Sequence, residues 1–287
     1  MPVLTAARVT IVAGKGGVGK TTVTAVLARA AADAGRRVLV VELDGKPVLG
    51  ALAGDIRCET ILAPAALEEY LRAHGFGRFA KRLSSSGVID VVATAAPGID
   101  DIVVLGKIKQ LERSKRWDVI VVDGPAAGHA VTFLLAAAGL RDAVRSGPVR
   151  VQADDVLEML HDSSRSQVVL VTVPETTPVN EAVETAFALE DRVGVKLGAI
   201  VVNEVDRLAD GERPPDPRTV ALPAGPDAEL LARAADYRRS RLEMQDEEID
   251  RLARELALEQ WQLPLLPVAG LDAEHVKVLA GALRGGP

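Results

Sequence analysis

Short runs of β-branched and other apolar residues recur along the chain, and longer segments with helical periodicity separate them. Runs that are apolar at successive positions are typical of strands covered on both faces of a sheet. The pattern predicts six such strands, at residues 9–13, 37–43, 88–92, 118–122, 167–173 and 197–202.

The segments between these runs predict helices. Residues 20–34 are rich in alanine and end before Gly35, a residue typical of the position after a helix. Helices are also expected at 100–116 and 178–193, the second with Thr177 as its cap and Pro178 in its first turn. Alternating strands and helices indicate an α/β fold, a mostly parallel twisted sheet with helices on both faces.

Three segments depart from this alternation. Residues 134–166 hold about one helix more than a crossover needs, which indicates a small helical insertion. Residues 209–228 contain five prolines and are predicted to be a linker, and residues 229–260 are charged with recurring leucines, which predicts a long, partly exposed helix. No internal repeat is present. We expect one domain over residues 1–287, with a helical elaboration, rather than two independent domains.

Composition narrows the function. Of 287 residues, 34 are basic and 40 acidic, so the chain is acidic overall. An acidic chain is a poor candidate for nucleic-acid binding, which needs a basic surface. A single cysteine, Cys58, excludes an internal disulfide and fits a reducing compartment. The N-terminus does not resemble a secretory signal, and the longest apolar stretch, residues 130–140, is too short to span a bilayer. We expect a cytoplasmic protein without stable membrane insertion.

The strongest motif is a phosphate-binding loop that follows the first predicted strand and opens the first predicted helix. Its glycines let backbone N–H groups converge on phosphate oxygens, while Lys20 neutralises the β- and γ-phosphates and the Thr21 hydroxyl binds Mg²⁺. A purely structural glycine turn would leave the two lysines unexplained. The predicted nucleotide contacts are Gly14, Lys15, Gly16, Gly17, Val18, Gly19, Lys20, Thr21 and Thr22.

Besides Lys20, the loop contains another lysine, Lys15, near its start. This early lysine marks the deviant Walker A type of P-loop ATPase. In that type the early lysine is expected to reach the phosphates of a partner subunit and to act in catalysis like an arginine finger, beside Lys20. The alternative is a solvated lysine beside an anionic ligand.

Two acidic residues lie where predicted strands end, next to the ligand crevice of an open α/β sheet. Asp44 follows the second strand and is expected to activate the attacking water or to hold Mg²⁺ through water; the alternative is an aspartate that starts a helix. We assign no role to Glu42, which is expected to point elsewhere. Asp123 ends an apolar strand, as in a Walker B motif, and is predicted to lie near Mg²⁺.

Residues 124–129 follow Asp123 and are predicted to form a hinge-like loop. The Gly128 N–H is expected to detect the γ-phosphate, so that hydrolysis would release the loop. His129, as a lone histidine, is interpreted as a structural group more readily than as a catalyst.

The chain resembles the family of arsenite-pump ATPases and tail-anchored-protein-targeting ATPases over nearly its whole length. Residues 96–98, 106–109 and 147–154 look like the actinobacterial branch of that family. The other segments that carry the resemblance are residues 14–22, Asp44, Asp123 with Gly128 and His129, Phe133 and Leu134, and residues 173–178, 201–204, 237–254 and 263–267.

The resemblance implies hydrolysis of ATP with Mg²⁺ by a dimer, either a homodimer or a heterodimer with a paralogous ATPase. It also implies that Asn203 reads the adenine and that Pro267 packs against it. By themselves, Asn203 is an ordinary residue at a strand end and Pro267 an ordinary turn residue.

Departures from the family bear on partner and client. The chain has no C-x-x-C for an interfacial zinc, and Cys58 alone cannot bind a metalloid through several thiols. It carries one ATPase half, Gly124 and Ala127 replace threonines of the switch segment, and the insertion is not rich in methionine. A membrane protein or another apolar client is therefore left open, with the insertion as its surface. The alternative is that the apolar faces of the insertion, with Leu157, Met159 and Leu160, belong to the core.

Three functions compete. The first is a Mg²⁺-dependent dimeric ATPase whose nucleotide state shapes a helical surface for a client or partner. The second is a spatial regulator of the cell-division or partition type, which needs a basic amphipathic C-terminal helix; residues 274–284 are short and weakly basic. The third, an inactive subunit of a heterodimer, is disfavoured because the predicted catalytic set is complete.

Overall fold

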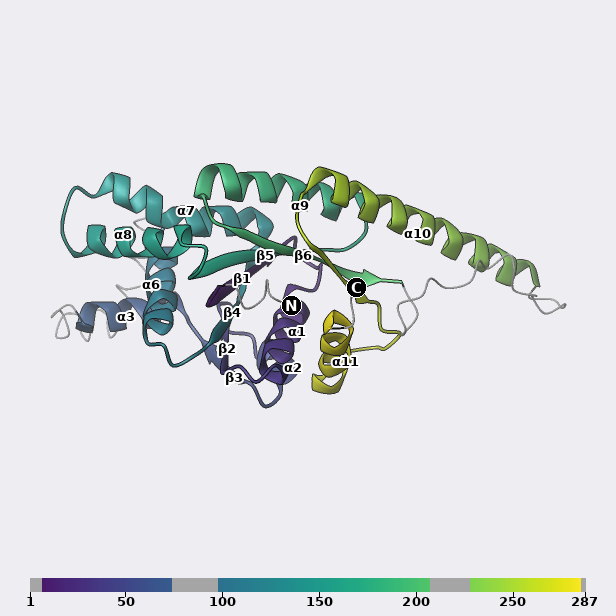
Figure 1. The fold of residues 1–287 in the computed structure, drawn as a ribbon, viewed down its shortest axis with the longest axis horizontal. Coiled ribbons are helices and arrows are strands. Elements are labelled where there is room, and N and C mark those ends of the chain that lie inside the picture. Colours follow the sequence, from purple (N-terminus) through teal and green to yellow (C-terminus); the bar gives the residue numbers. More distant parts are fainter. Residues whose placement is uncertain (1–6, 74–97, 207–227, 285–287) are drawn as a thin grey trace.

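The computed structural model describes residues 7–73, 98–206 and 228–284. Within these residues the strands form one parallel seven-stranded sheet in the order β3-β2-β4-β1-β5-β6-β7 (Figure 1). The strands are β1 (Val9–Gly14), β2 (Val38–Glu42), β3 (Arg57–Thr60), β4 (Val119–Ala126), β5 (Ser166–Thr172), β6 (Leu197–Val205) and β7 (Gln260–Pro264).

The five central strands confirm the expected positions to within a few residues, and the strand expected at 88–92 lies outside the described residues. The outermost strands, β3 and β7, were not expected. Both are exposed or half-buried at most positions, and their sequences lack a continuous apolar run. An edge strand needs no apolar cover on both faces, which removes the signal that identifies a central strand.

Helices cover both faces of the sheet, as the alternating pattern predicts (Figure 1). One face is covered by α1 (Lys20–Asp33), α2 (Val48–Ala53) and α11 (Ala273–Arg284), which share a buried core with Val12, Val40 and Val121 of the sheet. The second core lies on the opposite face and includes residues of α6 (Ile99–Arg113), α7 (Ala127–Ala143), α8 (Pro148–His161), α9 (Thr176–Ala188) and α10 (Ala228–Glu255).

Two helix boundaries differ from expectation. The predicted cap Thr177 lies inside α9, which begins at Thr176 and continues into a π-helical turn at Leu189–Val193. The long helix was expected to reach residue 260, but α10 ends at Glu255, and residues 260–264 form β7. Leu256, just after the helix, is buried, so packing against the core turns the chain back towards the sheet.

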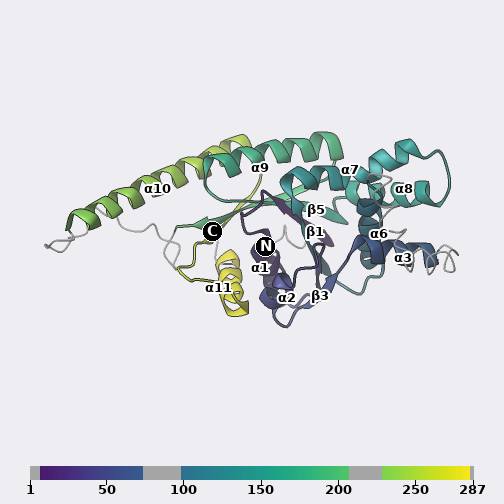
Figure 2. The same cartoon turned by 180° about the vertical axis from the view of Figure 1, so that it is seen from behind.

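The first half of α10 extends away from the body (Figures 1 and 2). The buried residues of this helix begin at Leu242, whereas Leu230 and Tyr237 are exposed. This agrees with a long helix that is only partly packed.

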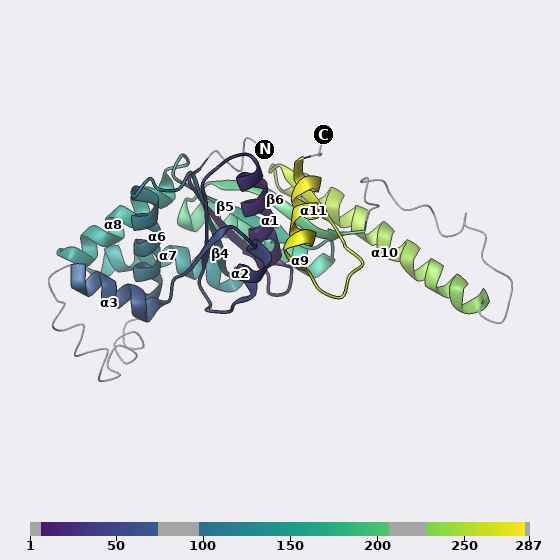
Figure 3. The ribbon, with the colours of Figure 1, turned by 90° about the horizontal axis from the view of Figure 1, so that it is seen from below.

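The segment expected as an insertion contains most of α7 and all of α8. α7 begins earlier than expected, at Ala127, and contacts β4, β1 and α9, while α8 contacts α6, α7 and β5. Together with α3 (Ala63–Ala73) and α6 these helices gather at one end of the molecule (Figure 3). The proline-rich segment lies outside the described residues except for Ala228, the first residue of α10.

Among the helices of the described residues, none combines the length and apolar character that crossing a membrane requires.

Candidate nucleotide and switch site

The predicted phosphate loop lies between β1 and α1, at the carboxyl edge of the sheet. Gly17 and Gly19 have φ of 90° and 85°, the left-handed region that favours glycine. A Cβ on Gly14 would lie 2.2 Å from the Val171 carbonyl oxygen, so this position needs glycine for a different reason, the close approach of β5. The loop conformation therefore depends on glycine at several positions, as the motif requires.

Two side-chain hydrogen bonds also hold the loop, one from Lys20 at the end of the loop and one from Asn203 on β6. Lys20 Nζ donates a hydrogen bond to the Lys15 carbonyl oxygen over 3.1 Å. Asn203, buried on β6, donates from Nδ2 to the Val18 carbonyl oxygen over 3.0 Å. A Cβ on Gly19 would lie 2.3 Å from that same Nδ2, so glycine at this position leaves room for the amide.

Lys20 and the start of α1 supply positive potential. Partial burial lowers the pKa of Lys20, and the nearby Asp123 carboxylate opposes that shift. No side chain of the described residues caps the N-terminus of α1, so its first backbone N–H groups can bind an anion. The geometry agrees with a site for phosphate.

Asp123 lies beside α1, as the Walker B interpretation predicts. Thr21 Oγ1 donates to Asp123 Oδ2 over 2.8 Å, and Thr24 Oγ1 donates to Oδ1 over 3.3 Å. Burial raises the pKa of Asp123, although these hydrogen bonds and Lys20 oppose the shift. A threonine hydroxyl next to a carboxylate, beside a phosphate loop, fits Mg²⁺, which is commonly held by one or two carboxylates and substrate phosphates.

Asp44 follows β2 and is engaged by Lys46 in this structure. Its Oδ1 accepts the Lys46 backbone N–H over 3.1 Å, and its Oδ2 lies 3.0 Å from Lys46 Nζ. Burial alone would raise the pKa of Asp44, but the contacts with Lys46 outweigh it and lower the pKa. The carboxylate is therefore ionised at neutral pH, as a group that accepts a proton from water must be.

Glu42, to which we assigned no role, lies in the same cluster. It is buried, aligns with Asp123 on β4 and with Thr60 on β3, and accepts a hydrogen bond from Thr60 Oγ1 over 3.2 Å. The Asp44 carboxylate lies nearby; burial is the main cause that raises the pKa of Glu42, and the neighbouring carboxylate adds to it. The expectation that Glu42 points elsewhere was wrong; its spacing of two from Asp44 was the signal that could have found it.

The segment after Asp123 is not the expected hinge-like loop. β4 continues to Ala126 and passes directly into α7 at Ala127. A Cβ on Gly124 would lie 2.4 Å from the Val12 carbonyl oxygen, so glycine is needed where β4 approaches β1. Gly128 lies in the first turn of α7, where a backbone N–H has no acceptor within the helix.

Lys15, at the start of the loop, forms an ion pair with Glu181 of α9, with 2.6 Å between Nζ and Oε1. Each of these side chains is about a third exposed, and Gly128, Glu181 and Thr185 line one cavity of about 310 Å³ between α7 and α9. Lys15, Gly128 and the start of α7 thus lie along one surface.

The other predicted site residues are Gly16, Gly17, Thr22 and Pro267. Gly16 and Gly17 are exposed in the loop, and Thr22 is on α1. Pro267 is exposed after β7, within a tight turn in which the Val268 N–H bonds to the Leu266 carbonyl oxygen over 2.8 Å. His129 is exposed on α7.

Comparison with known proteins gives the family. Residues 9–213 match the model of the CobQ/CobB/MinD/ParA nucleotide binding domain. The chain is 32% identical to ATPase BagA of Mycobacterium tuberculosis, over 79% of this chain and 78% of that protein. It is 29% identical to an arsenical pump-driving ATPase of Escherichia coli, over 70% of this chain but 35% of that protein.

These matches cover the phosphate loop, Asp44, Asp123 and Asn203, whose side chains and backbone the fold brings to one edge of the sheet. The chain belongs to the CobQ/CobB/MinD/ParA nucleotide binding domain family and, within it, to the P-loop ATPases related to the arsenical pump-driving ATPases.

Proposed function

We propose that this chain is a Mg²⁺-dependent ATPase that works as a nucleotide-driven dimeric switch. The observation that carries the proposal is the hydrogen bond between Thr21 and Asp123, beside Lys20 at the mouth of the phosphate loop. This pair would hold Mg²⁺, which neutralises phosphate charge when bound. Phosphate-loop N–H groups and Lys20 would hold the β- and γ-phosphates.

The water that attacks the γ-phosphate would be oriented by Asp44, which stands at the carboxyl end of β2 and is ionised. To contact that water, the Asp44 carboxylate must first release the Lys46 side chain. Glu42, whose carboxyl lies near that of Asp44, would help to keep the Asp44 carboxylate in place. The Oδ1 of Asn203 would accept from the adenine amino group, since its Nδ2 already bonds to Val18, and Pro267 would pack against the base.

A direct test compares ATP binding and hydrolysis in the wild type with Lys20→Ala and Asp123→Asn, with and without Mg²⁺. We expect Lys20→Ala to lose nucleotide binding and Asp123→Asn to bind nucleotide with a weakened dependence on Mg²⁺. Hydrolysis that is equally fast without Mg²⁺, or unchanged in both variants, would refute the proposal.

The dimer is inferred from Lys15. In the single chain this lysine is held by an ion pair at the surface, and exposed pairs of this kind contribute about 0.2–1 kcal/mol. A partner's phosphates could therefore draw it away. The partner is a second copy or a paralogous ATPase. Since the sequence has no C-x-x-C, the interface would not use zinc bound by that motif.

The output is proposed to be a surface on residues 129–165. Because β4 runs into α7 without a loop, a displacement at Asp123 or Gly128 is passed directly to α7, and from there to α8. Moving such a surface from mostly closed to mostly open takes about 5.5 kcal/mol of differential binding. From the family resemblance, the occupant of that surface would be a membrane protein or another apolar client.

Hydrogen exchange tests this coupling. Exchange of residues 129–165 is measured with ADP and with a non-hydrolysable ATP analogue, in a preparation shown to bind both. We expect protection to differ between the two states in α7 and α8. Equal protection would place the output of the ATPase elsewhere.

A further inference from the structure

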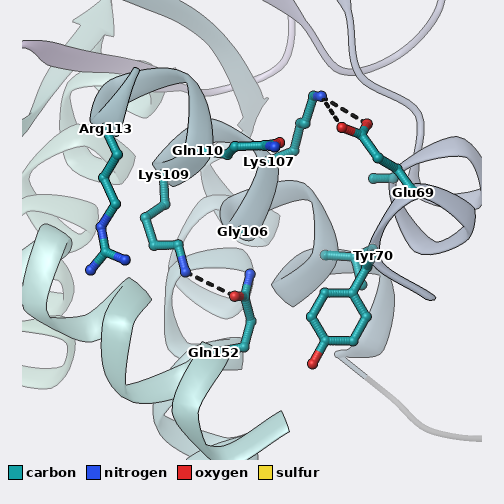
Figure 4. Close-up of a pocket in the computed structure, with 10 residues that line it drawn as sticks. Glu69, Tyr70, Gly106, Lys107, Lys109, Gln110, Arg113 and Gln152 are labelled. Carbon is teal, nitrogen blue, oxygen red and sulfur yellow. Dashed lines mark hydrogen bonds and ion pairs between the residues drawn. The ribbon is translucent and has the colours of Figure 1, made fainter. Parts of the chain in front are cut away.

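A second site lies in the helical end of the molecule, away from the phosphate loop. It is a cavity of about 280 Å³ between α3, α6 and α8. Figure 4 shows long polar side chains around it, from all three helices. The residues that line it are Ala66, Glu69, Tyr70, Val103, Gly106, Lys107, Lys109, Gln110, Arg113 and Gln152.

The cavity depends on a close contact between α6 and α8. A Cβ on Gly106 would lie 1.7 Å from Gln152 Nε2, so glycine lets the Gln152 amide lie against α6. In that position Gln152 Oε1 accepts a hydrogen bond from Lys109 Nζ over 2.8 Å (Figure 4). These residues come from two segments, 106–109 and 147–154, that resemble one branch of the family and that nucleotide binding leaves without a role.

Lys109 is the central cation of the site. Its side chain is only 8% exposed, and Nζ also donates to Asp155 Oδ2 over 2.9 Å. An ammonium group has three N–H donors, and within the described residues two are used, which leaves one for a ligand. Apolar residues of similar volume often replace a buried ion pair at no loss of stability, so packing alone does not require a lysine here.

Two cations of the cavity, Lys109 and Arg113, share one carboxylate oxygen. Arg113 Nη1 donates to Asp155 Oδ2 over 3.0 Å, the same oxygen that Lys109 uses. Burial alone would raise the pKa of Asp155, but its hydrogen bonds from Lys109 and Arg113 outweigh it and lower the pKa. Glu69 pairs with Lys107. Asp155 thus serves both Lys109 and Arg113. The side chain of Arg113 is 47% exposed, and its Nη2 lies 4.0 Å from Glu158 Oε2, a carboxylate that Arg165 also pairs with.

We propose that this cavity binds a small organic anion, with its carboxylate or phosphate group between Lys109 and Arg113 and its apolar part against Ala66 and Val103. Because Lys109 and Arg113 share the Asp155 oxygen, and Glu158 is itself shared between Arg113 and Arg165, the positive charge of Lys109 and Arg113 is only partly compensated. The cavity is slightly below the usual size of small-molecule pockets, about 300–1,000 Å³, so the ligand would be small.

The test is a titration of isotope-labelled full-length protein, followed by NMR, with benzoate, phenyl phosphate and the uncharged benzyl alcohol. Excess Mg²⁺ and ADP keep the phosphate loop occupied, and their binding is measured separately. We expect saturable shifts with at least one anion and not with benzyl alcohol. Benzoate binding alone would indicate a carboxylate ligand, and phenyl phosphate binding alone a phosphate ester.

Variants place the anion. Lys109→Met and Arg113→Gln should each weaken binding by about tenfold, which corresponds to about 1.4 kcal/mol. Gly106→Ala should weaken it as well, because the new methyl displaces the flexible end of Gln152, while helix propensity keeps the fold stable. Arg116→Gln is the matched control, since this exposed arginine follows α6 and does not line the cavity.

The test remains decisive even if Lys109→Met fails to fold. Arg113 is exposed, so Arg113→Gln should fold, and Gly106→Ala leaves the charges of the site unchanged. No saturable binding of either anion, equal binding of benzyl alcohol, or wild-type affinity in both Arg113→Gln and Gly106→Ala would overturn the proposal.

Discussion

Lys15 and Glu181 lie 166 positions apart in the sequence and form an ion pair of 2.6 Å at the mouth of the phosphate loop. The pair holds, within one chain, the lysine that is proposed to reach the phosphates of a partner. Lys15 cannot contact Glu181 and a partner's phosphates at the same time. In the proposed dimer, the strength of the pair would therefore set part of the free energy of closure.

Glu181→Gln should therefore favour the ATP-bound dimer. Since exposed ion pairs contribute about 0.2–1 kcal/mol, the dimer dissociation constant should fall by up to about fivefold. Sedimentation with a non-hydrolysable ATP analogue measures it. Glu184→Gln is the control, because Glu184 lines the same cavity but has no ion pair with Lys15. A weaker dimer in Glu181→Gln, or the same change in both variants, would count against cis pairing as a restraint.

Asp44→Asn should retain nucleotide binding and lower the hydrolysis rate by about 10²–10⁴, the usual contribution of a positioned acid or base. Steady-state turnover together with ADP affinity separates the two effects. Lys46→Met should keep turnover, because it removes the ion pair but not the carboxylate. If Asp44→Asn hydrolyses ATP as fast as the wild type, the attacking water is oriented elsewhere.

Lys46→Met should also change the pH dependence. Contacts with Lys46 lower the pKa of Asp44, so the carboxylate stays ionised as the pH falls below the ordinary range of aspartate. Without Lys46 the pKa rises, and the acid limb of the rate profile should move to higher pH. An unchanged acid limb would show that another group controls it.

A comparison of Gly128→Pro with Gly128→Ala should separate the effect of losing the backbone N–H from the effect of adding a side chain. A Cβ at this position meets nothing within 4 Å, so alanine should be tolerated and should keep the preference for ATP over ADP. Proline removes the N–H and is compatible with the first turn of a helix, so it should bind ADP but lose that preference. Equal preference in both variants would exclude the Gly128 N–H as the γ-phosphate sensor.

Asp118→Asn should lower stability at neutral pH and less so in acid. Hydrogen bonds from the side chain and backbone of Arg37 hold the pKa of Asp118 well below its usual range. A carboxyl group whose pKa is lower in the folded than in the unfolded state stabilises the fold at pH values above its unfolded-state pKa. This stabilisation is lost as the pH falls towards the folded-state pKa. The difference in Tm between variant and wild type should therefore shrink from pH 7 to pH 3. Asp142→Asn, which changes an exposed aspartate outside this pair, is the control variant.

The sequence alone determined much of what depends on neighbours along the chain, although it missed the direct passage of β4 into α7 and the end of α10 at Glu255. The glycine spacing of residues 14–22 predicts the loop, and continuous apolar runs predict the five central strands, because such runs are typical of strands covered on both faces of a sheet. Asp44 and Asp123 were found for the same reason, since each follows such a run.

The tertiary structure decided what depends on contact between distant segments. β3 and β7 form because the sheet offers an edge, not because their residues demand a strand. Pairing of β4 with β2 brings Glu42 level with Asp123, and the approach of α8 to Gly106 places Gln152 beside Lys109. Local periodicity carries no record of such contacts, because their energy comes from burial and charge shared between helices and strands that only the fold brings together.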